Sequence, residues 1–387
     1  MFLKEKKHIL ILPSWYSNSL NPLSGIFFKE QAEALAKQNN IKVGCIAINE
    51  SSPRNIFHSK NINFEYSHSD INGVNTINIL YPIPNRFKKL RQIVRMQVFK
   101  ILFKKYISTY GKPDIVHLHS FLYGHLAIWI KENFGINYIV TEHSSGFARK
   151  IYNKQDLAYA KNVFLNSSYN IAVSHQFAIL LEQIFHLKFN YLPNSIDTDY
   201  FNKAEIKTKN DFKFINIAFL DPIKNQKLLI ESFSQAFKHE QNVKLVIVGD
   251  GKQYDNLDNL IKKLKLENQV SLYGRASRDE AKELLRESDA FVLSSTYETF
   301  GVVVIEAMSC GLPVVSTRCG GPESVIVNDS LGLLVQNDSK RELAFGMKKI
   351  YQTQYNHDAI RRYIIDNFSS NAISQKLIAI YSALCSK

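Results

Sequence analysis

The chain has 387 residues, enough for two domains of ordinary size, each with its own hydrophobic core. Its hydrophobic share of 45% and aromatic share of 12% are typical of a globular protein, and no segment approaches the roughly 18 to 20 apolar residues of a membrane-spanning helix. The net charge of +13 is unevenly distributed, because residues 1–200 hold 23 Lys and Arg against 13 Asp and Glu. The four cysteines are scattered without metal-ligand spacing, which fits a reduced cytoplasm.

The chain begins with a short apolar run, HILIL, which predicts a first strand and not a signal peptide. The loop PSWYSNSLNPLSG follows, and Gly25 stands at its end, just before a predicted helix. A glycine at such a turn lets the backbone approach a ligand closely. A simple turn glycine is the alternative interpretation.

A basic segment comes next, since residues 71–113 contain no acidic residue. Within it, NRFKKLRQIVRMQVFKILFKKY predicts an amphipathic helix with Leu90 and Ile101 on its apolar face. The helix either packs on the core with a solvated basic face or contacts an anionic membrane. Nucleic acid is not expected as a partner, because no nucleic-acid-binding motif accompanies the charge. The candidates for membrane or acceptor contact are Arg86, Lys88, Lys89, Arg91 and Arg95.

Three histidines follow in two predicted strands. In IVHLHS, the spacing of two places His117 and His119 on one face of a strand, and without a carboxylate cluster nearby a structural role is favoured over a metal site. His143, in VTEHSSG, comes directly after the next apolar run. Its imidazole is therefore expected at the carboxyl edge of the sheet, where ligands bind.

Short apolar strands alternate with helical patterns along almost the whole chain, which predicts an α/β protein with two Rossmann-like, doubly wound parallel-sheet domains. The expected strands are HILIL, KVGCIAI, DIVHLHS, NYIVT and NIAVS in the first half, and FKFINIAFL, VKLVIVG, QVSLYG, AFVLSS, LPVVST and LGLLV in the second. Turn-forming and charged residues place the boundary near residue 195, so the expected domains are 1–194 and 195–369. The carboxyl edges of both sheets are expected to face a shared cleft.

The second half carries three loops of interest. Lys224 lies in DPIKNQKLLI, VGDGKQ holds only a G-x-G turn that does not suffice for a dinucleotide fingerprint, and Arg275 follows the predicted strand in LYGRAS. The loop SSTYETFG, which contains Thr299 and Phe300, precedes an apolar helix that begins near Gly301.

Glu298 lies just before that helix and Glu306 about one turn inside it. A carboxylate is costly in such apolar surroundings unless something pairs with it. The free N–H groups at a helix start attract phosphate, and two hydroxyl-binding carboxylates beside a phosphate site would suit a sugar nucleotide.

This stretch resembles the E-x7-E signature of the retaining glycosyltransferases of family 4, which have the GT-B fold, and GLPVVSTRCGGPESV after it strengthens the resemblance. The resemblance extends over nearly the whole chain and implies that helix 370–387 packs back on the first domain. One departure stands out, because Ala218 and Phe219 replace the usual Gly-Arg that binds the donor diphosphate.

The resemblance also implies residue roles. The Gly25 loop would reach over the donor diphosphate and Lys224 would bind it, while the Arg275 loop would flank the nucleobase. Glu306 would accept hydrogen bonds from the ribose, and Glu298 and His143, the candidate catalytic residues, would hold the transferred sugar. The backbone N–H groups of Phe300 and Gly301 would stabilise the charge of the leaving group.

We therefore expect a retaining glycosyltransferase that moves a hexose-type sugar from a UDP- or GDP-sugar, UDP favoured, to a glycan or lipid-linked acceptor. The expected setting is bacterial cell-surface polysaccharide, lipopolysaccharide or glycoprotein glycan synthesis, in the cytoplasm or peripherally on the inner face of the cytoplasmic membrane. No metal or other cofactor is expected, on the interpretation that the sequence lacks the D-x-D pattern that chelates a diphosphate-bound cation in other glycosyltransferases. The alternatives are another GT-B enzyme, such as a sugar-nucleotide epimerase, and a noncatalytic partner subunit.

Overall fold

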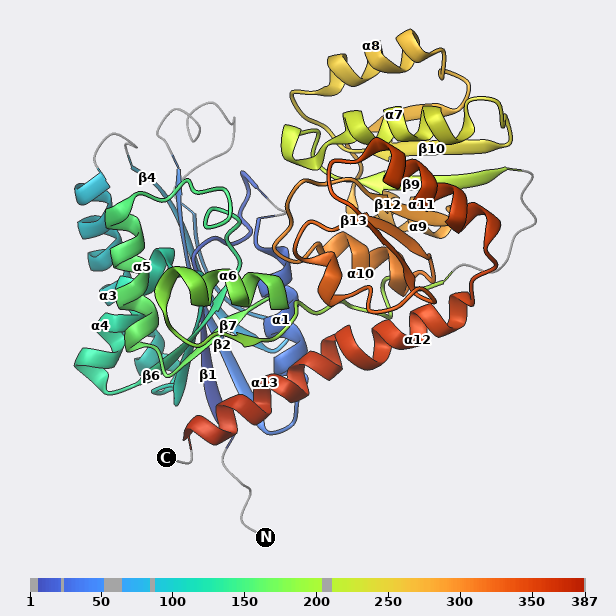
Figure 1. Cartoon of the computed structure of the whole chain (residues 1–387). Helices are drawn as coiled ribbons and strands as arrows, with labels where there is room; N and C mark the ends of the chain where they lie inside the picture. The colour runs from blue at the N-terminus through green and yellow to red at the C-terminus, as the bar shows by residue number, and fades with distance from the viewer. Residues whose placement is uncertain (1–5, 22–23, 52–64, 84–87, 204–210, 386–387) are drawn as a thin grey trace. The chain divides into compact units, whose positions relative to one another are not determined.

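A computed structural model of the chain describes residues 6–21, 24–51, 65–83, 88–203 and 211–385 (Figure 1). The chain folds into two compact units. The first consists of Met1–Ala172, Leu180–Ser195 and Ile373–Lys387, and the second of Val173–Ile179 and Ile196–Ala372. The main division thus falls one residue beyond the expected end of the first domain, and a short piece near residue 175 belongs to the second unit.

The first unit is built on an eight-stranded sheet with the order β3-β4-β2-β1-β5-β6-β7-β8. All neighbouring strands pair in parallel except β3 and β4. The central strands are buried on both faces and read as continuous apolar runs, as parallel strands between helix layers do. The strands are β1 (Lys7–Pro13), β2 (Ile41–Ser51), β3 (Glu65–Ile71), β4 (Val74–Pro82), β5 (Ile115–His119), β6 (Asn137–Glu142), β7 (Tyr169–Ala172) and β8 (Asn190–Tyr191).

The hairpin of β3 and β4 is absent from the strands expected from the sequence. Its turn consists of Asn72 and Gly73, with φ of 53° and 82°. Two consecutive positive φ values define the turn that Asn-Gly favours between antiparallel strands. The expected parallel sheet therefore gains one antiparallel edge strand.

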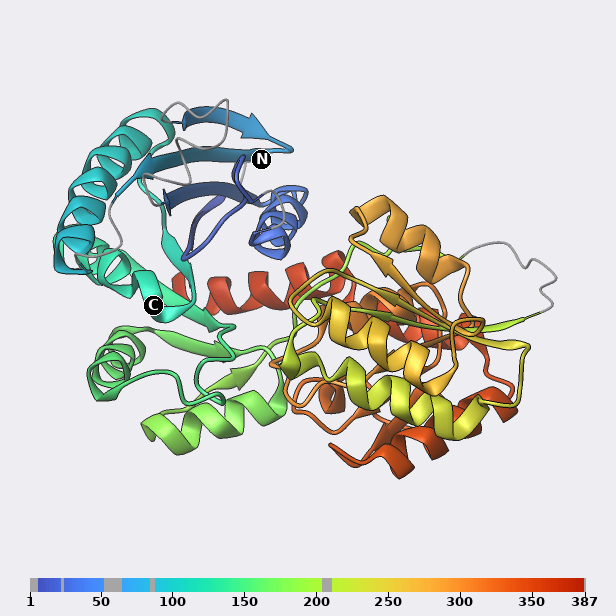
Figure 2. The same cartoon turned by 90° about the horizontal axis from the view of Figure 1, so that it is seen from above.

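Helices cover both faces of this sheet (Figures 1 and 2). On one face, α1 and the C-terminal part of α13 pack on β1 and β2, with Leu35, Leu377 and Tyr381 in the same core cluster as Ile9 and Val43. On the other face lie α3 and α4, where the ring of Trp129 meets the rings of α3 edge-on. The helices are α1 (Ile26–Ala36), α3 (Lys88–Tyr110), η1 (Phe121–Tyr123), α4 (Gly124–Phe134), α5 (Lys154–Asn166), α6 (His175–Phe185) and α13 (Ser370–Cys385).

The face of α3 that packs on the core is not the stripe that contains Leu90 and Ile101, although Leu102, expected near the same face, is buried at 5% exposure. Leu90 and Ile101 are 48% and 68% exposed, and Ile93 is 59% exposed, whereas Phe99 and Phe103 are fully buried. The aromatic residues are larger, so burying them removes more apolar surface from water than burying Leu90 and Ile101 would.

The second unit has a six-stranded, fully parallel sheet with the order β11-β10-β9-β12-β13-β14. Each of its strands coincides with an apolar run expected from the sequence, and the α/β class with two parallel-sheet domains is confirmed. The strands are β9 (Phe212–Ile217), β10 (Val243–Val248), β11 (Val270–Gly274), β12 (Ala290–Leu293), β13 (Val314–Thr317) and β14 (Gly332–Val335). The helices are η2 (Pro222–Lys224), α7 (Gln226–Phe237), α8 (Tyr254–Leu264), α9 (Arg278–Arg286), α10 (Val302–Ser309), η3 (Pro322–Ser324), α11 (Lys340–Gln352) and α12 (His357–Phe368).

Candidate active site

In the second unit, the loop between β12 and α10 lies at the carboxyl edge of the sheet, where ligands of parallel α/β sheets bind. Helix α10 begins directly after Gly301, as expected from the sequence. Phe300 is buried and its ring lies 6.2 Å from that of Phe368, so its side chain belongs to the core of this unit. Thr299 is partly buried in the same loop.

A second loop, around Lys224, is fastened to this one. The Ser294 hydroxyl donates to the Lys224 carbonyl at 2.8 Å, and the Thr296 N–H donates to the Ile223 carbonyl at 2.8 Å. Lys224 Nζ donates to Glu298 Oε1 at 2.6 Å, and the Ser295 hydroxyl donates to the same oxygen at 2.9 Å. An expected donor-binding residue, Lys224, and an expected catalytic residue, Glu298, thus form an ion pair.

Gly321 allows a third loop, the one after β13, to pass close to the backbone of Phe300. A Cβ atom at this position would lie 2.4 Å from backbone atoms of Phe300, closer than real Cβ contacts allow. The neighbouring Gly320 forms a bridge with Glu298, whose N–H donates to the Cys319 carbonyl at 2.8 Å. The CGGPES string therefore fixes the backbone of the Glu298 loop.

The remaining candidates of this unit are spread along the same edge. Glu306 is partly buried, one turn inside α10. Arg275 is exposed in the loop after β11, which joins the loop after β10 through a 2.8 Å hydrogen bond from the Gly249 N–H to the Gly274 carbonyl. Phe219 is 75% exposed after β9, so the residue in place of the usual Arg is an apolar side chain in solvent.

In the first unit, Gly25 adopts a left-handed conformation, with φ of 65°, and precedes α1. A Cβ atom there would lie 2.6 Å from the carbonyl oxygen of Trp15. The fold itself therefore explains this glycine, and the approach of a ligand is not needed to account for it.

His143 lies at the end of a stack of imidazoles. The ring centroids of His117 and His119 are 4.2 Å apart and those of His119 and His143 5.4 Å, and His119 Nδ1 lies 3.1 Å from His143 Nε2. The rings of Phe27 and Phe28, on α1, pack against His143 with centroids 5.2 and 4.9 Å away. The Nδ1 atom of His143 is buried without a hydrogen-bond partner among the described residues.

His117 is a structural residue, as favoured from the sequence. Its Nδ1 lies 2.7 Å from the Tyr381 hydroxyl, on α13, and its Nε2 lies 2.7 Å from the Thr141 hydroxyl. Burial lowers the pKa of His117 to about 3, and burial, with a smaller contribution from the neighbouring His117 imidazole, lowers the pKa of His143 to about 3. Both imidazoles are therefore neutral at physiological pH.

Glu142, beside His143, organises the loop. Its Oε1 accepts the N–H groups of His143 and Ser144 at 2.8 Å each, while Oε2 accepts the Phe121 N–H at 2.9 Å. Burial raises the pKa of Glu142 more than these hydrogen bonds lower it. The carboxyl group is buried and has no exposure to a ligand, so its role is to hold the backbone that presents His143.

The basic candidates of α3 differ from one another. Arg91 and Arg95 share the single carboxylate of Glu50, with Nη2 to Oε2 distances of 2.8 and 2.7 Å. Lys89 is exposed. Arg86 and the side chain of Lys88 lie outside the described residues.

The residues that the structure describes contain no group of three or more His, Cys, Asp or Glu arranged to hold a metal ion. The sequence does contain one D-x-D triplet, at Asp197 and Asp199. Asp197 Oδ1 accepts the N–H groups of Asp199 and Tyr200 at 3.0 Å each, so this triplet caps a turn. Among the described helices, none is long and apolar enough to cross a membrane.

Three important residues are missing from the sequence-based candidates. Ser295 supports Glu298, Tyr381 supports His117, and Glu50 binds two arginines. Of these three, only Glu50 could have been recognised from the sequence, as an acidic residue at the end of an apolar strand.

Two family models match the chain. One described as Glycosyltransferase Family 4 covers residues 25–200, and one described as Glycosyl transferases group 1 covers residues 197–370. An uncharacterized glycosyltransferase of Methanocaldococcus jannaschii is 27% identical over 291 residues, which is 75% of this chain and 78% of that protein.

Solved structures share the fold over the whole chain. Sucrose-phosphate synthase from Thermosynechococcus elongatus has a TM-score of 0.78 at 20% identity, covering 98% of this chain and 100% of that one. HepE of Anabaena, solved in complex with UDP, has a TM-score of 0.71 at 18% identity, covering 97% and 100%. The two consecutive family matches and the shared fold show that the chain belongs to the family 4 glycosyltransferases with the GT-B fold.

Proposed function

We propose that this glycosyltransferase transfers a hexose-type sugar from a nucleoside diphosphate sugar, with a UDP-sugar favoured, and retains its anomeric configuration. The observation that carries the proposal is the arrangement at the start of α10. Glu298 lies before this helix and Glu306 inside it, and Lys224 Nζ forms an ion pair with Glu298 Oε1 at 2.6 Å. The complex of HepE with UDP supports a uridine nucleotide.

The donor would be held mainly by the second unit. The N–H groups at the start of α10 would bind the diphosphate, because a helix start carries positive partial charge. Lys224 has three N–H donors, of which Glu298 takes one, so the others remain for a phosphate oxygen. Glu306 would accept hydrogen bonds from the ribose hydroxyls and Glu298 from hydroxyls of the transferred sugar.

His143 would bind the transferred sugar as a neutral imidazole. Its buried Nδ1 has no partner among the described residues, and its low pKa of about 3 makes it unsuited to general base catalysis near pH 7. Following the family resemblance, a phosphate oxygen of the donor would help to deprotonate the acceptor hydroxyl on the leaving-group face. Neither glutamate is proposed as a covalent nucleophile, and no metal is proposed.

Calorimetric titration with UDP and 2′-deoxy-UDP tests the ribose assignment. We expect the wild type to prefer UDP and Glu306→Gln to lose most of that preference, since a hydrogen bond to a charged group contributes about 1.5–3 kcal/mol, or roughly 10- to 100-fold in affinity. Glu267→Gln, an exposed position after α8, is the matched control. An unchanged preference in Glu306→Gln would show the ribose assignment to be wrong.

We further propose that the enzyme works peripherally on an anionic membrane, in the cytoplasm, on a glycan or lipid-linked acceptor of bacterial surface glycan synthesis. Helix α3 supports this, because Leu90, Ile93 and Ile101 form an exposed stripe on a helix without acidic residues, and Lys104 and Lys105 are exposed beside it.

Vesicle sedimentation tests this location. Binding should rise with anionic lipid, fall with salt, and weaken in Ile93→Ser but not in Leu165→Ser, a control in α5 with a nearly equal exposure of 58% against 59%. Binding that ignored lipid charge would contradict the proposal.

A noncatalytic partner subunit is the second candidate, and the exposed Phe219 in place of the usual Arg favours it. A sugar-nucleotide epimerase would instead release a changed sugar without any acceptor. Incubation of the purified chain with a panel of labelled UDP- and GDP-sugars separates the three. Transfer or slow hydrolysis with release of the nucleotide supports the transferase, and an unchanged donor supports the subunit.

A further inference from the structure

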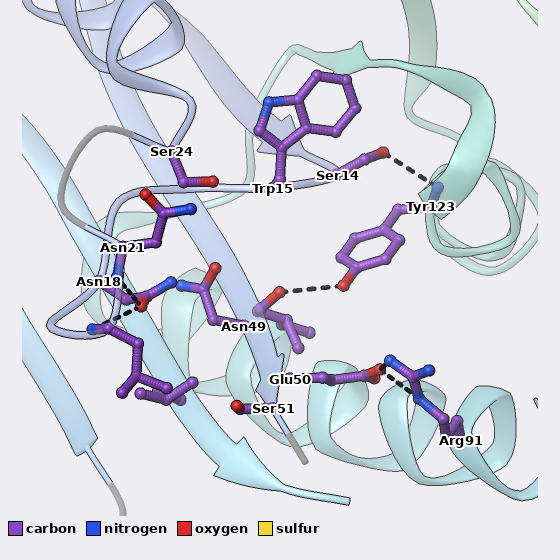
Figure 3. Close-up of a pocket in the computed structure, with 13 residues that line it drawn as sticks. Ser14, Trp15, Asn18, Asn21, Ser24, Asn49, Glu50, Ser51, Arg91 and Tyr123 are labelled. Carbon is purple, nitrogen blue, oxygen red and sulfur yellow. Dashed lines mark hydrogen bonds and ion pairs between the residues drawn. The ribbon is translucent and has the colours of Figure 1, made fainter. Parts of the chain in front are cut away.

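The first unit contains a polar pocket of about 280 Å³ on its own surface (Figure 3). The loop after β1 contributes Trp15 and Asn18, the end of β2 contributes Asn49 and Glu50, and α3 contributes Arg91. The volume is at the lower end of the range of ligand pockets, which is about 300–1,000 Å³. It therefore suits a single sugar residue and not a long glycan.

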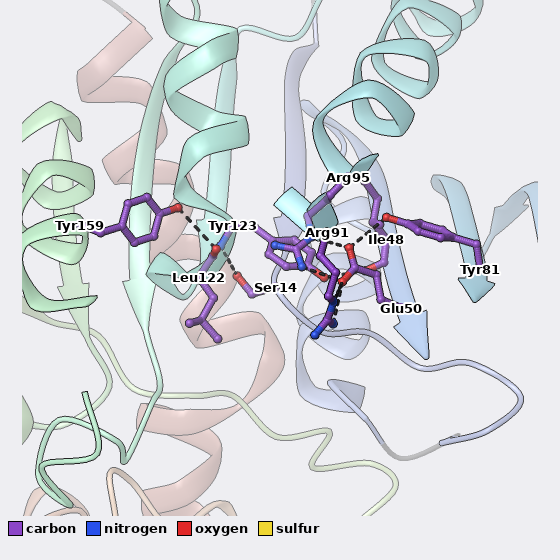
Figure 4. Close-up of polar contacts among 9 residues, drawn as sticks. All are labelled: Ser14, Ile48, Glu50, Tyr81, Arg91, Arg95, Leu122, Tyr123 and Tyr159. Atoms are coloured by element: carbon purple, nitrogen blue, oxygen red, sulfur yellow. Dashed lines mark hydrogen bonds and ion pairs between the residues drawn. The ribbon is translucent and has the colours of Figure 1, made fainter. Parts of the chain in front are cut away.

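An ion cluster forms one end of the pocket (Figure 4). Glu50 Oε1 accepts from the Tyr81 hydroxyl at 2.9 Å and from Arg95 Nε at 2.7 Å, and Oε2 accepts from Arg91 Nε at 3.1 Å. The side chain of Glu50 is 2% exposed, that of Arg95 is 11% exposed and that of Arg91 is 28% exposed. Exposure to the pocket thus increases outward from Glu50 to Arg91.

The cluster carries a surplus positive charge. Burial raises the pKa of Glu50, but the hydrogen bonds and charge of Arg95 and the hydrogen bonds of Tyr81 and Arg91 lower it further, so Glu50 is ionised. Burial raises the pKa of Tyr123 to about 12, so this tyrosine is neutral. One carboxylate therefore faces two guanidinium groups, and one positive charge is left over in a poorly solvated place, where an anion would be favourable.

That charge is available to a ligand at Arg91. Arg95 does not line the pocket, and its guanidinium lies over the ring of Tyr123, 4.2 Å from the centroid. Arg91 does line it, and Glu50 takes two of its five N–H groups. Asn18 and Asn49 also line the pocket, whereas the ring of Trp15 points away from Arg91 (Figure 3). The Asn18 amide is bonded within its own loop and Asn49 Nδ2 donates to Asn78 Oδ1 at 2.9 Å, so the charge at Arg91 is the main attraction for a ligand.

We propose that this pocket binds an acceptor sugar that carries one negatively charged group, a carboxylate or a phosphate ester, with the anionic oxygens on Arg91. The inference rests on the proposed function in that it takes the first unit to bind the acceptor, and it goes beyond it by naming the chemical class of that acceptor.

Ligand-observed NMR titration of the full chain tests the proposal with three probes: methyl glucuronide, glucose 6-phosphate and the neutral methyl glucoside. We expect at least one acidic sugar to bind about tenfold or more tightly than the neutral one, as one charged hydrogen-bonded contact implies. The first two probes distinguish a carboxylate from a phosphate ester.

Arg91→Gln should abolish the preference for acidic sugars, whereas Lys161→Gln, which removes one exposed positive charge from α5, should retain it. Thermal unfolding identifies any variant that fails to fold, and Arg91→Lys, which keeps the charge, should retain part of the preference in that case. Equal affinity for acidic and neutral sugars, or an unchanged preference in folded Arg91→Gln, would overturn the proposal. Titration of UDP into the same samples separates the proposed donor binding from the proposed acceptor pocket. Normal UDP binding without a preference for acidic sugars would refute only the pocket assignment.

Discussion

The ion pair between Lys224 and Glu298 can be measured by a double-mutant cycle with Lys224→Met and Glu298→Gln. The two atoms are 2.6 Å apart, and the side chains are 25% and 13% exposed. A hydrogen bond between charged groups contributes about 1.5–3 kcal/mol, and partial exposure reduces this. Since Ser295 still donates to Glu298 when Lys224 is removed, we expect a coupling energy of about 1–2 kcal/mol.

Thermal and denaturant unfolding of the four proteins give this coupling energy. Each single substitution should lower the melting temperature of the second unit by about 2–8 °C. The same proteins separate structure from donor binding, because Lys224→Met should weaken both UDP and UDP-sugar, whereas Glu298→Gln should weaken only the UDP-sugar.

A coupling energy close to zero would show that the pair does not form in solution. Equal loss of UDP affinity in both single variants would show that Glu298 supports the nucleotide site and does not bind the transferred sugar. Either result would refute the reasoning that separates the roles of the two residues.

Three further predictions concern stability. Because the pKa of His117 is lowered to about 3 in the folded chain, the unfolded chain alone binds this proton as the pH falls below about 6.5, so this residue should account for a loss of about 1–2 kcal/mol of stability by pH 5. Other buried histidines such as His143 add to the loss, so His117→Gln should make the pH profile of unfolding less steep by that amount. Glu50→Gln should cost about 3 kcal/mol, the lower end for a buried pair, because the nearly buried Arg95 and the partly exposed Arg91 lose their counterion, and urea unfolding measures this. Gly321→Ala should lower the melting temperature and weaken UDP binding together, because a Cβ atom would displace Phe300, whereas the same change at Gly111, where the space is open, should affect stability only.

Periodicity and loop residues predicted the second unit nearly completely. Its strands are uninterrupted apolar runs bounded by turns, and the start of α10 after Gly301 follows from the switch between loop formers and an apolar helix. The β3–β4 hairpin was harder to predict because EYSHSDI is polar and lies at the sheet edge, although Asn72-Gly73 is a hairpin signal.

Contacts between distant parts of the chain could not be predicted. The pairing of His117 with Tyr381 joins residues 264 positions apart, and Glu50 meets Arg95 only because β2 and α3 pack together. On α3, apolar residues lie on several faces, so the helical pattern favoured the stripe with Leu90 and Ile101, whereas aromatic packing buries Phe99 and Phe103.

The most direct test of the account is hydrogen–deuterium exchange of the full chain with and without UDP. We predict slower exchange in peptides that cover the Glu298 loop, the start of α10 and the Lys224 loop, because the nucleotide would bind their N–H groups and join the two loops. Protection confined to other segments, at saturating UDP, would contradict the placement of the donor at α10.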